Sequence, residues 1–305
     1  MMDSIHKPVL LNEVLSEFVD SKGLIIDATL GLGGHSFVLL EQNKNINIIG
    51  IDRDIEAISI AKERLGRFGK RFEVLHSNFS NGIKEILSKH NNIAGILADI
   101  GISSYQIDNP NRGFGFYSDN LDMRMDLSLP LNAKMIINSY PKDELHRIFT
   151  EYGEIKNPSL ITKIILSHRK KHTIESAREL SQLIESNTKI HTKIHPATLI
   201  FQALRIEVND ELGELRRFLA NIENLKKAKV AIISFHSLED RIVKETFKIW
   251  SKSCICSNDN LKCTCGNNHK KGEILNKKPI IPSQNEIKMN RRARSAKMRC
   301  FRFYG

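Results

Sequence analysis

Asp27-Ala28-Thr29-Leu30-Gly31-Leu32-Gly33-Gly34-His35-Ser36 is the stretch that decides the fold. It begins inside a short run, residues 24–28, that is apolar except for Asp27, and it passes through a glycine-rich turn into a segment able to form a helix. Glycines in such a turn let the backbone approach a ligand closely at a helix N-terminus. The stretch therefore predicts a strand, a ligand-binding turn and a helix, in that order.

Strand and helix patterns continue to alternate on both sides of this stretch. Further buried strands are predicted at 46–51, 72–75, 93–98 and 230–235, and helices at 55–65, 83–87 and 239–250. Strands separated by helices of this length require right-handed crossovers. The sequence thus predicts an α/β fold with a parallel, doubly wound sheet, in which ligands bind at the carboxyl ends of the strands.

Chemically suitable side chains follow these strands. Asp52 closes the second strand about twenty residues after the glycines, where a carboxylate can accept hydrogen bonds from both ribose hydroxyls. Phe79 follows the third strand and is placed to pack on a purine ring, and Asp99 ends the fourth. His236 ends the fifth strand, where we expect it to face the pocket. The combination indicates a cofactor that contains adenosine.

The charge near the turn distinguishes between two such cofactors. A dinucleotide fingerprint would have a third glycine at position 36, which is Ser36. Asp27, directly before the turn, would repel a pyrophosphate but suits a cationic ligand. We therefore favour S-adenosylmethionine, which carries an ammonium and a sulfonium, and keep NAD as the alternative.

The alternation stops after Asp99. A loop rich in glycine and aromatic residues follows, and helical patterns then dominate from residue 141 to about residue 219. A helical block inserted into an α/β domain explains this order. We expect residues 1–107 and 212–305 to form the cofactor-binding domain and residues 108–211 an inserted helical domain.

Positive charge is concentrated at the end of the chain. The formal net charge is +11 over 305 residues, and after residue 265 eleven Lys and Arg face only Glu273 and Glu286. Such a segment favours a polyanion such as nucleic acid, although a solvated basic tail is the alternative. Phe301, Phe303 and Tyr304 interleave with the charges, as a final strand or as a stacking surface.

The cysteines leave a question open. Cys254-Ile255-Cys256 and Cys263-Thr264-Cys265 form two C-x-C pairs. Four thiolates can build a tetrahedral zinc site, although C-x-x-C spacing is the stronger signal, and the alternative is a flexible loop with reduced thiols. No metal site is assigned from the sequence.

Several motifs, in one order, resemble those of a known family. The matching segments include 27–36, 99–104, 112–114, 121–126, 201–206, 208–212, 234–241 and 294–299. On these segments the chain resembles the RsmH (MraW) family of ribosomal RNA small subunit methyltransferases over nearly its whole length.

The resemblance implies a class I methyltransferase (Rossmann-like) domain with an inserted helical domain for substrate recognition. It implies S-adenosylmethionine as cofactor and N4-methylcytosine in the decoding centre of 16S rRNA, within the small ribosomal subunit, as product. Carried over by motif, the cofactor contacts are Gly33, Gly34, His35, Asp52, Phe79, Asp99 and Gln106.

The chemistry of this reaction suggests a catalytic residue. An exocyclic amine needs an acceptor for its N–H groups, and we expect Asp99 or a backbone carbonyl of residues 100–103 in this role. The target base must leave its stack, and Tyr105, Phe114 or Phe116 is expected to stack on it.

Two other functions stay open, namely a non-catalytic RNA-binding assembly factor and a small-molecule methyltransferase. The sequence has no apolar run that could span a bilayer and no cleavable signal pattern. We therefore expect a cytoplasmic protein without a membrane partner. The oligomeric state is left open, with a homodimer among the options.

Overall fold

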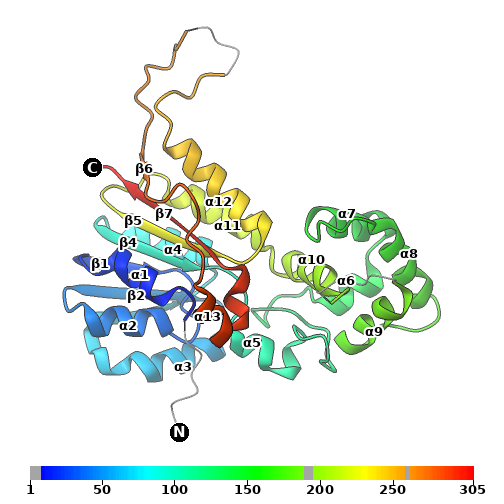
Figure 1. Ribbon diagram of the computed structural model, residues 1–305. Helices are drawn as coiled ribbons and strands as arrows, with labels where there is room; N and C mark the ends of the chain where they lie inside the picture. The colour runs from blue at the N-terminus through cyan, green and yellow to red at the C-terminus, as the bar shows by residue number, and fades with distance from the viewer. Residues whose placement is uncertain (1–7, 189–194, 258–261) are drawn as a thin grey trace. The chain divides into compact units, whose positions relative to one another are not determined.

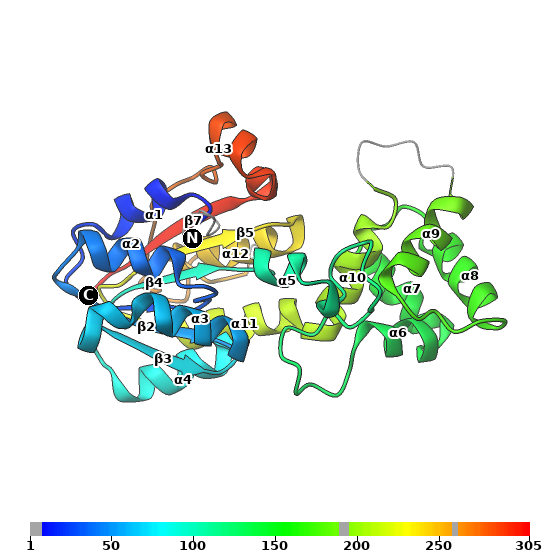
Figure 2. The same cartoon turned by 90° about the horizontal axis from the view of Figure 1, so that it is seen from below.

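The computed structural model describes residues 8–188, 195–257 and 262–305. The chain divides into two compact units, one made of Met1–Gly101 with Gly213–Gly305 and the other of Ile102–Leu212. Figures 1 and 2 show the elements of both. The second unit begins before the predicted boundary at residue 107, because a short helix from Ser104 to Asp108 belongs to it.

The described part of the first unit holds a seven-stranded sheet in the order β3-β2-β1-β4-β5-β7-β6. The strands are β1 (Gly23–Asp27), β2 (Ile46–Asp52), β3 (Phe72–His76), β4 (Ile93–Asp99), β5 (Lys229–Ser234), β6 (Gly272–Ile274) and β7 (Lys297–Phe303). β1 to β5 all run parallel to one another, whereas β7 runs antiparallel between β5 and β6. The doubly wound, Rossmann-like α/β sheet is confirmed.

β7 shows which role two aromatic residues of the basic tail have, for which the sequence allows a final strand or a stacking surface. Its side chains alternate, so that Met298 and Cys300 join one hydrophobic cluster while Phe301 and Phe303 are buried on the other face. Phe301 packs against Phe247 with ring centroids 5.2 Å apart. These two rings belong to a final strand, and their interpretation as an exposed stacking surface is wrong.

Helices cover both faces of the sheet (Figure 1). The helices of this unit are α1 (Leu11–Phe18), α2 (Gly34–Gln42), α3 (Ile55–Leu65), α4 (Phe79–Lys89), α11 (Glu211–Ile222), α12 (Ser237–Trp250) and α13 (Gln284–Met289). Residues of α1, α2 and α3 share a core with Ile25 of β1 and Leu97 of β4. α12 contributes Phe247 to the opposite face. Among the described residues, no helix combines the length and the apolar character that a membrane span requires.

The second unit is helical, as the sequence predicts. Its α-helices are α5 (Ser104–Asp108), α6 (Ala133–Ser139), α7 (Lys142–Glu151), α8 (Pro158–Arg169), α9 (Ala177–Asn187) and α10 (Thr198–Asn209). The helices α6 to α10 share an apolar core. Asn132, Asn157 and Ser176 begin three of these helices, because each side chain accepts a hydrogen bond from a backbone N–H of the first turn.

Two buried polar side chains hold the loop between α5 and α6. Arg112 donates to the carbonyls of Arg124 and Met125 at 3.1 and 2.8 Å. Asn209 donates to Met123 O and accepts from Met125 N, each at 2.8 Å. Arg112 is therefore a structural cation of this loop and does not face solvent.

Part of the basic tail is also structural. Arg299 of β7 is buried, and its guanidinium donates to both carboxylate oxygens of Asp240 at 2.6 and 3.2 Å. Lys297 approaches the same carboxylate at 3.6 Å. Arg299 and Lys297 together hold the pKa of Asp240 below its ordinary value, although its partial burial acts in the opposite direction.

We predict that Asp240→Ala lowers the free energy of unfolding by about 2 kcal/mol, because it leaves the buried charge of Arg299 without its partner. Urea unfolding measures the change. Glu273→Ala is the matched control, since it breaks an exposed 3.6 Å pair with Arg302 on the same strand, and its cost is below about 0.5 kcal/mol. Equal losses for the two variants would contradict the structural role of Arg299.

Candidate cofactor site

The candidate site lies where the chain reverses its direction of winding. β1 lies between β2 and β4, so successive strands are added on one side of β1 up to β3 and on its other side from β4 onward. The carboxyl ends of neighbouring parallel strands then form a crevice. Thr29 ties the ends of β1 and β4 together, since its hydroxyl accepts a hydrogen bond from Asp99 N at 2.6 Å. The predicted strand-end residues therefore share one edge of the sheet.

The glycine turn has two different requirements. Gly31 and Gly33 both have positive φ, 51° and 73°, which favours glycine. A Cβ on Gly33 would lie 2.7 Å from Leu65 Cδ1, and one on Gly34 would lie 2.6 Å from Pro8 Cγ. A Cβ on Gly31 would meet nothing within 4 Å. Gly33 and Gly34 are thus fixed by packing, and Gly31 marks the open side of the turn.

Asp52 connects this turn to the end of β2. Its two carboxylate oxygens accept hydrogen bonds from Gly31 N at 2.7 Å and from Asp54 N at 2.9 Å. Burial nevertheless raises the pKa of Asp52 above its ordinary value. Each oxygen keeps a second lone pair, so the carboxylate can still accept from the two hydroxyls of a ribose.

Asp27 explains the serine that interrupts the glycine fingerprint. Its carboxylate is buried and accepts a 2.6 Å hydrogen bond from the hydroxyl of Ser36. Burial raises the pKa of Asp27 to about 6, although this hydrogen bond works against the shift. A glycine at position 36 would remove the donor that holds this carboxylate.

Asp99 is the least satisfied group of the site. Its Oδ1 atom is buried and has no hydrogen-bond partner among the described residues. Burial, with repulsion from Asp27 and Glu239, raises the pKa of Asp99 to about 8. His35 Nδ1 lies 3.9 Å from Asp99 Oδ2, but burial lowers the pKa of His35 to about 4, and its Nε2 donates to Val9 O at 2.9 Å. The neutral imidazole therefore forms no ion pair with Asp99.

These residues fit a cationic cofactor. Asp27 is buried, and Asp99, which its charge repels, has a buried oxygen without a partner among the described residues. Both carboxylates gain from a ligand that brings positive charge. S-adenosylmethionine brings an ammonium and a sulfonium, whereas the pyrophosphate of NAD would add negative charge to the same edge. The geometry accordingly favours S-adenosylmethionine over the dinucleotide.

Two further predicted contacts have structural roles of their own. Phe79 is the first residue of α4, and its largely buried ring packs edge-to-face on Phe218, with centroids 5.2 Å apart. Gln106 belongs to the second unit, where it completes a capping box with Ser103 at the start of α5. Their contacts with a cofactor stay predictions.

The expected base-stacking residues also have partners within the second unit. Phe114 is buried. Phe116 stacks on His195 with ring centroids 4.4 Å apart and contacts Phe201 edge-to-face. A stacking role for these rings, or for Tyr105, stays a prediction.

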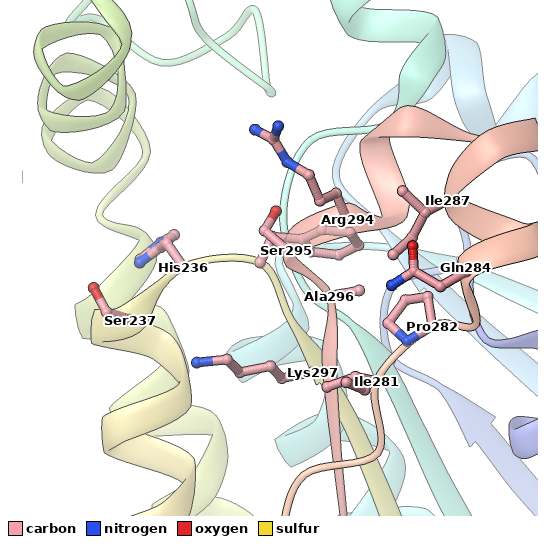
Figure 3. Close-up of a pocket in the computed structure, with 11 residues that line it drawn as sticks. His236, Ser237, Ile281, Pro282, Gln284, Ile287, Arg294, Ser295, Ala296 and Lys297 are labelled. Carbon is pink, nitrogen blue, oxygen red and sulfur yellow. The ribbon is translucent and has the colours of Figure 1, made fainter. Parts of the chain in front are cut away.

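A pocket of about 430 Å³ opens beyond the end of β5 (Figure 3). Its lining combines apolar side chains, among them Phe235, Pro282 and Ile287, with polar and cationic ones. The cationic side chains are Arg294 and Lys297, and His236 is a further polar one. Figure 3 shows Lys297 reaching from β7 toward the start of α12, on the opposite side from Gln284 and Ile287.

This pocket lies beside the strand that carries Asp99. Asp99 pairs in register with Ile233 of β5, and Phe235 and His236, which follow the end of this strand at Ser234, line the pocket. A contact of His236 with the cofactor stays a prediction. The sequence identified the charge of Arg294 and Lys297 but not their place, because the antiparallel course of β7 brings them there. The volume is within the range of small-ligand sites, about 300–1,000 Å³.

Comparison with known proteins agrees with the geometry. The sequence model of the MraW methylase family matches residues 3–304. A protein of Nitratiruptor sp. named ribosomal RNA small subunit methyltransferase H is 51% identical over 304 residues, with 99% of each chain covered. A protein of Helicobacter pylori with the same name is 53% identical over 304 residues, covering 99% of this chain and 98% of its own.

We predict that Asp99→Asn stabilises the protein without cofactor at alkaline pH. The pKa of Asp99 rises on folding from 3.8 to about 8, so the protonated form favours folding below pH 4 and this contribution is lost as the pH rises to 8. The gain from Asp99→Asn should therefore be at least about 1 kcal/mol at pH 9 and should shrink toward pH 4.

Urea unfolding at a series of pH values tests this expectation. Asp20→Asn, at an exposed position, is the control and should change stability little at any pH. A gain for Asp99→Asn that does not vary with pH would show that Asp99 is not held in an unfavourable charged state.

Proposed function

The chain belongs to the MraW methylase family, and on this basis we propose that it transfers a methyl group from S-adenosylmethionine to a cytosine of 16S rRNA. The proposed acceptor atom is the exocyclic N4 amine of a cytosine in the decoding centre of the small ribosomal subunit. Since the substrate is ribosomal RNA, the proposed place of action is the cytoplasm. The observation that carries the proposal is the buried Oδ1 atom of Asp99, which has no hydrogen-bond partner among the described residues.

The carboxylates at the strand ends bind different parts of the cofactor in this proposal. When bound, S-adenosylmethionine supplies an electrophilic methyl group on a sulfonium. Asp52 accepts hydrogen bonds from the ribose, and Asp27 provides negative charge for the cationic part of the cofactor. Positive charge near Asp99 lowers the pKa of its carboxyl group, which is raised to about 8 in the protein alone. Asp99 is thereby converted from a carboxylic acid into a carboxylate.

That conversion suits the chemistry of an amine acceptor. The N4 amine of cytosine is a weak nucleophile, because its lone pair is delocalised into the ring. An acceptor that takes its N–H hydrogen bond localises the lone pair and can receive the proton that the nitrogen must lose. In the proposal, Asp99 Oδ1 is this acceptor, and a backbone carbonyl of residues 100–103 is the alternative.

The surface charge supports an RNA substrate. Seven of the eleven cations after residue 265 are exposed, namely Lys270, Lys277, Lys278, Lys288, Arg291, Arg294 and Arg302. The pocket beside β5 offers apolar surface to a base or sugar and the cations of Arg294 and Lys297 to a phosphate. We propose that this pocket binds a nucleotide of the substrate strand next to the flipped cytosine.

Incubation with labelled S-adenosylmethionine and small ribosomal subunits, followed by digestion to nucleosides, tests the main proposal. We expect the label in N4-methylcytosine. Label in another nucleoside would overturn the assignment of the acceptor atom. No incorporation, with subunits still bound, would instead support a non-catalytic RNA-binding factor, and label confined to small molecules would support a small-molecule methyltransferase.

For Asp99→Asn we predict a loss of methylation of at least about 100-fold, because the amine loses its proton acceptor. Calorimetry should also report that the wild type releases a proton on binding S-adenosylmethionine at pH 7, whereas the variant releases none. Asp20→Asn is the control for both readouts. A variant that binds the cofactor normally and methylates at the full rate would exclude Asp99 from catalysis.

For Arg294→Gln we predict weaker binding of small subunits, by about threefold to tenfold, and a salt dependence reduced by about one phosphate contact. Arg302→Gln is the matched control, since Arg302 lies toward the other end of β7 and pairs with Glu273. Filter binding at several salt concentrations measures both. An equal effect of the two variants would argue for a diffuse charge effect and against a phosphate contact in the pocket.

A further inference from the structure

The loop between α12 and β6 carries four of the five cysteines, outside the site described above. Its described parts are residues 251–257 and 262–271, and Figure 1 shows it extending away from the sheet. The two ends are joined by backbone hydrogen bonds, from Lys271 N to Trp250 O at 2.8 Å and from His269 N to Ser253 O at 3.0 Å. Trp250 itself is buried and packs on Phe301 and Phe303. The two ends of the loop are thus held together next to the packed side chain of Trp250.

The four thiols of this loop lie close to one another. The Sγ atoms of Cys254, Cys256, Cys263 and Cys265 all lie within 4.8 Å of one another. The Cys263–Cys265 and Cys265–Cys254 sulfur atoms are 3.6 and 3.7 Å apart. In a tetrahedral site with Zn–S bonds of about 2.3 Å, sulfur atoms are about 3.8 Å apart. The spacing matches a set of ligands around one ion.

The same distances exclude a disulfide-bonded arrangement. All four cysteines are free thiols, and their separations are far longer than a disulfide bond of about 2.0 Å. The chain bends back so that one C-x-C pair faces the other.

Backbone N–H groups complete the arrangement in a reciprocal pattern. Ile255, the central residue of the first pair, donates its N–H to Cys265 Sγ at 3.4 Å. Thr264, the central residue of the second pair, donates its N–H to Cys256 Sγ at 3.3 Å. Such N–H···S bonds stabilise negative charge on sulfur and are the outer-shell contacts that thiolate metal sites use.

Apolar packing contributes little to this convergence. Ile255 is 56% exposed, and the residues beside the second pair are polar or glycine. A loop of this composition has too little apolar surface to bury for it to fix four side chains in place. A bound ion supplies the missing free energy in small sites of this kind.

We infer that Cys254, Cys256, Cys263 and Cys265 bind one structural zinc ion that fixes the loop between α12 and β6. Four soft thiolates in a closed tetrahedron favour Zn²⁺ over hard cations and leave no open position for catalysis. The inference concerns a part of the chain that the proposed methyl transfer does not use.

Metal analysis of the full chain, purified under reducing conditions without chelators from cells supplied with zinc, tests the inference. We expect about one zinc per chain. The double variant Cys254→Ser/Cys263→Ser removes one ligand from each pair and should lower the zinc content at least tenfold. Cys300→Ala is the matched control, because Cys300 is buried in β7 and should leave the zinc content unchanged.

A second readout covers the case in which metal is lost during purification. Reduced, metal-free protein titrated with Co²⁺ should develop the absorption of a tetrahedral tetrathiolate site, and the double variant should not. Zinc should also slow proteolytic cleavage in residues 251–271 of the wild type alone. A zinc content that stays below about 0.1 per chain after zinc is added to the reduced protein would overturn the inference, and so would iron bound in its place.

Discussion

Buried carboxylates at the ends of neighbouring parallel strands are the constraint on which the rest of the site depends. Burial raises the pKa of both Asp27 and Asp99, and the charge of a neighbouring carboxylate adds to it, Asp52 for Asp27 and Asp27 for Asp99. The fold tolerates this because Ser36 donates to Asp27 and because Asp99 keeps its proton at neutral pH in the absence of a ligand. The same unfavourable charge is what a cationic cofactor relieves. The carboxyl ends of these strands therefore favour the binding of a positively charged ligand.

Much of the first unit could be predicted from the sequence, because parallel strands are buried on both faces and leave continuous apolar runs. Asp52 and Asp99 follow from those runs, since a strand's end fixes where its next side chain lies. For β7 the sequence leaves two alternatives open, a final strand or a stacking surface. The reason is that cations and aromatic residues mix along this segment, so that the alternation of polar and apolar residues typical of a strand is not clear. Its neighbour β6 has three residues, too few for a pattern.

Residues that act through tertiary contacts could not be predicted in this way. Arg112 looks like a loop cation in sequence, yet its guanidinium is consumed by carbonyls of a later segment. Arg299 resembles its neighbours in the basic tail but is buried against Asp240. The roles of Gln106 as a capping residue and of Phe79 as a packing residue likewise depend on partners that spacing alone does not reveal. Charge and motif therefore single out residues without showing which partners they contact in the folded chain.

The order of the strands has a consequence for how the chain is made. β4 and β5 are neighbours in the sheet, but the whole second unit lies between them in sequence. During synthesis the outer edge of β4 is thus complete long before its partner emerges, and an unpaired edge invites wrong pairing. Early folding of the second unit around its own core would hold the two ends of the insertion together. It would thereby shorten the effective loop between β4 and β5. In this way the inserted unit would also help β5 to pair with β4.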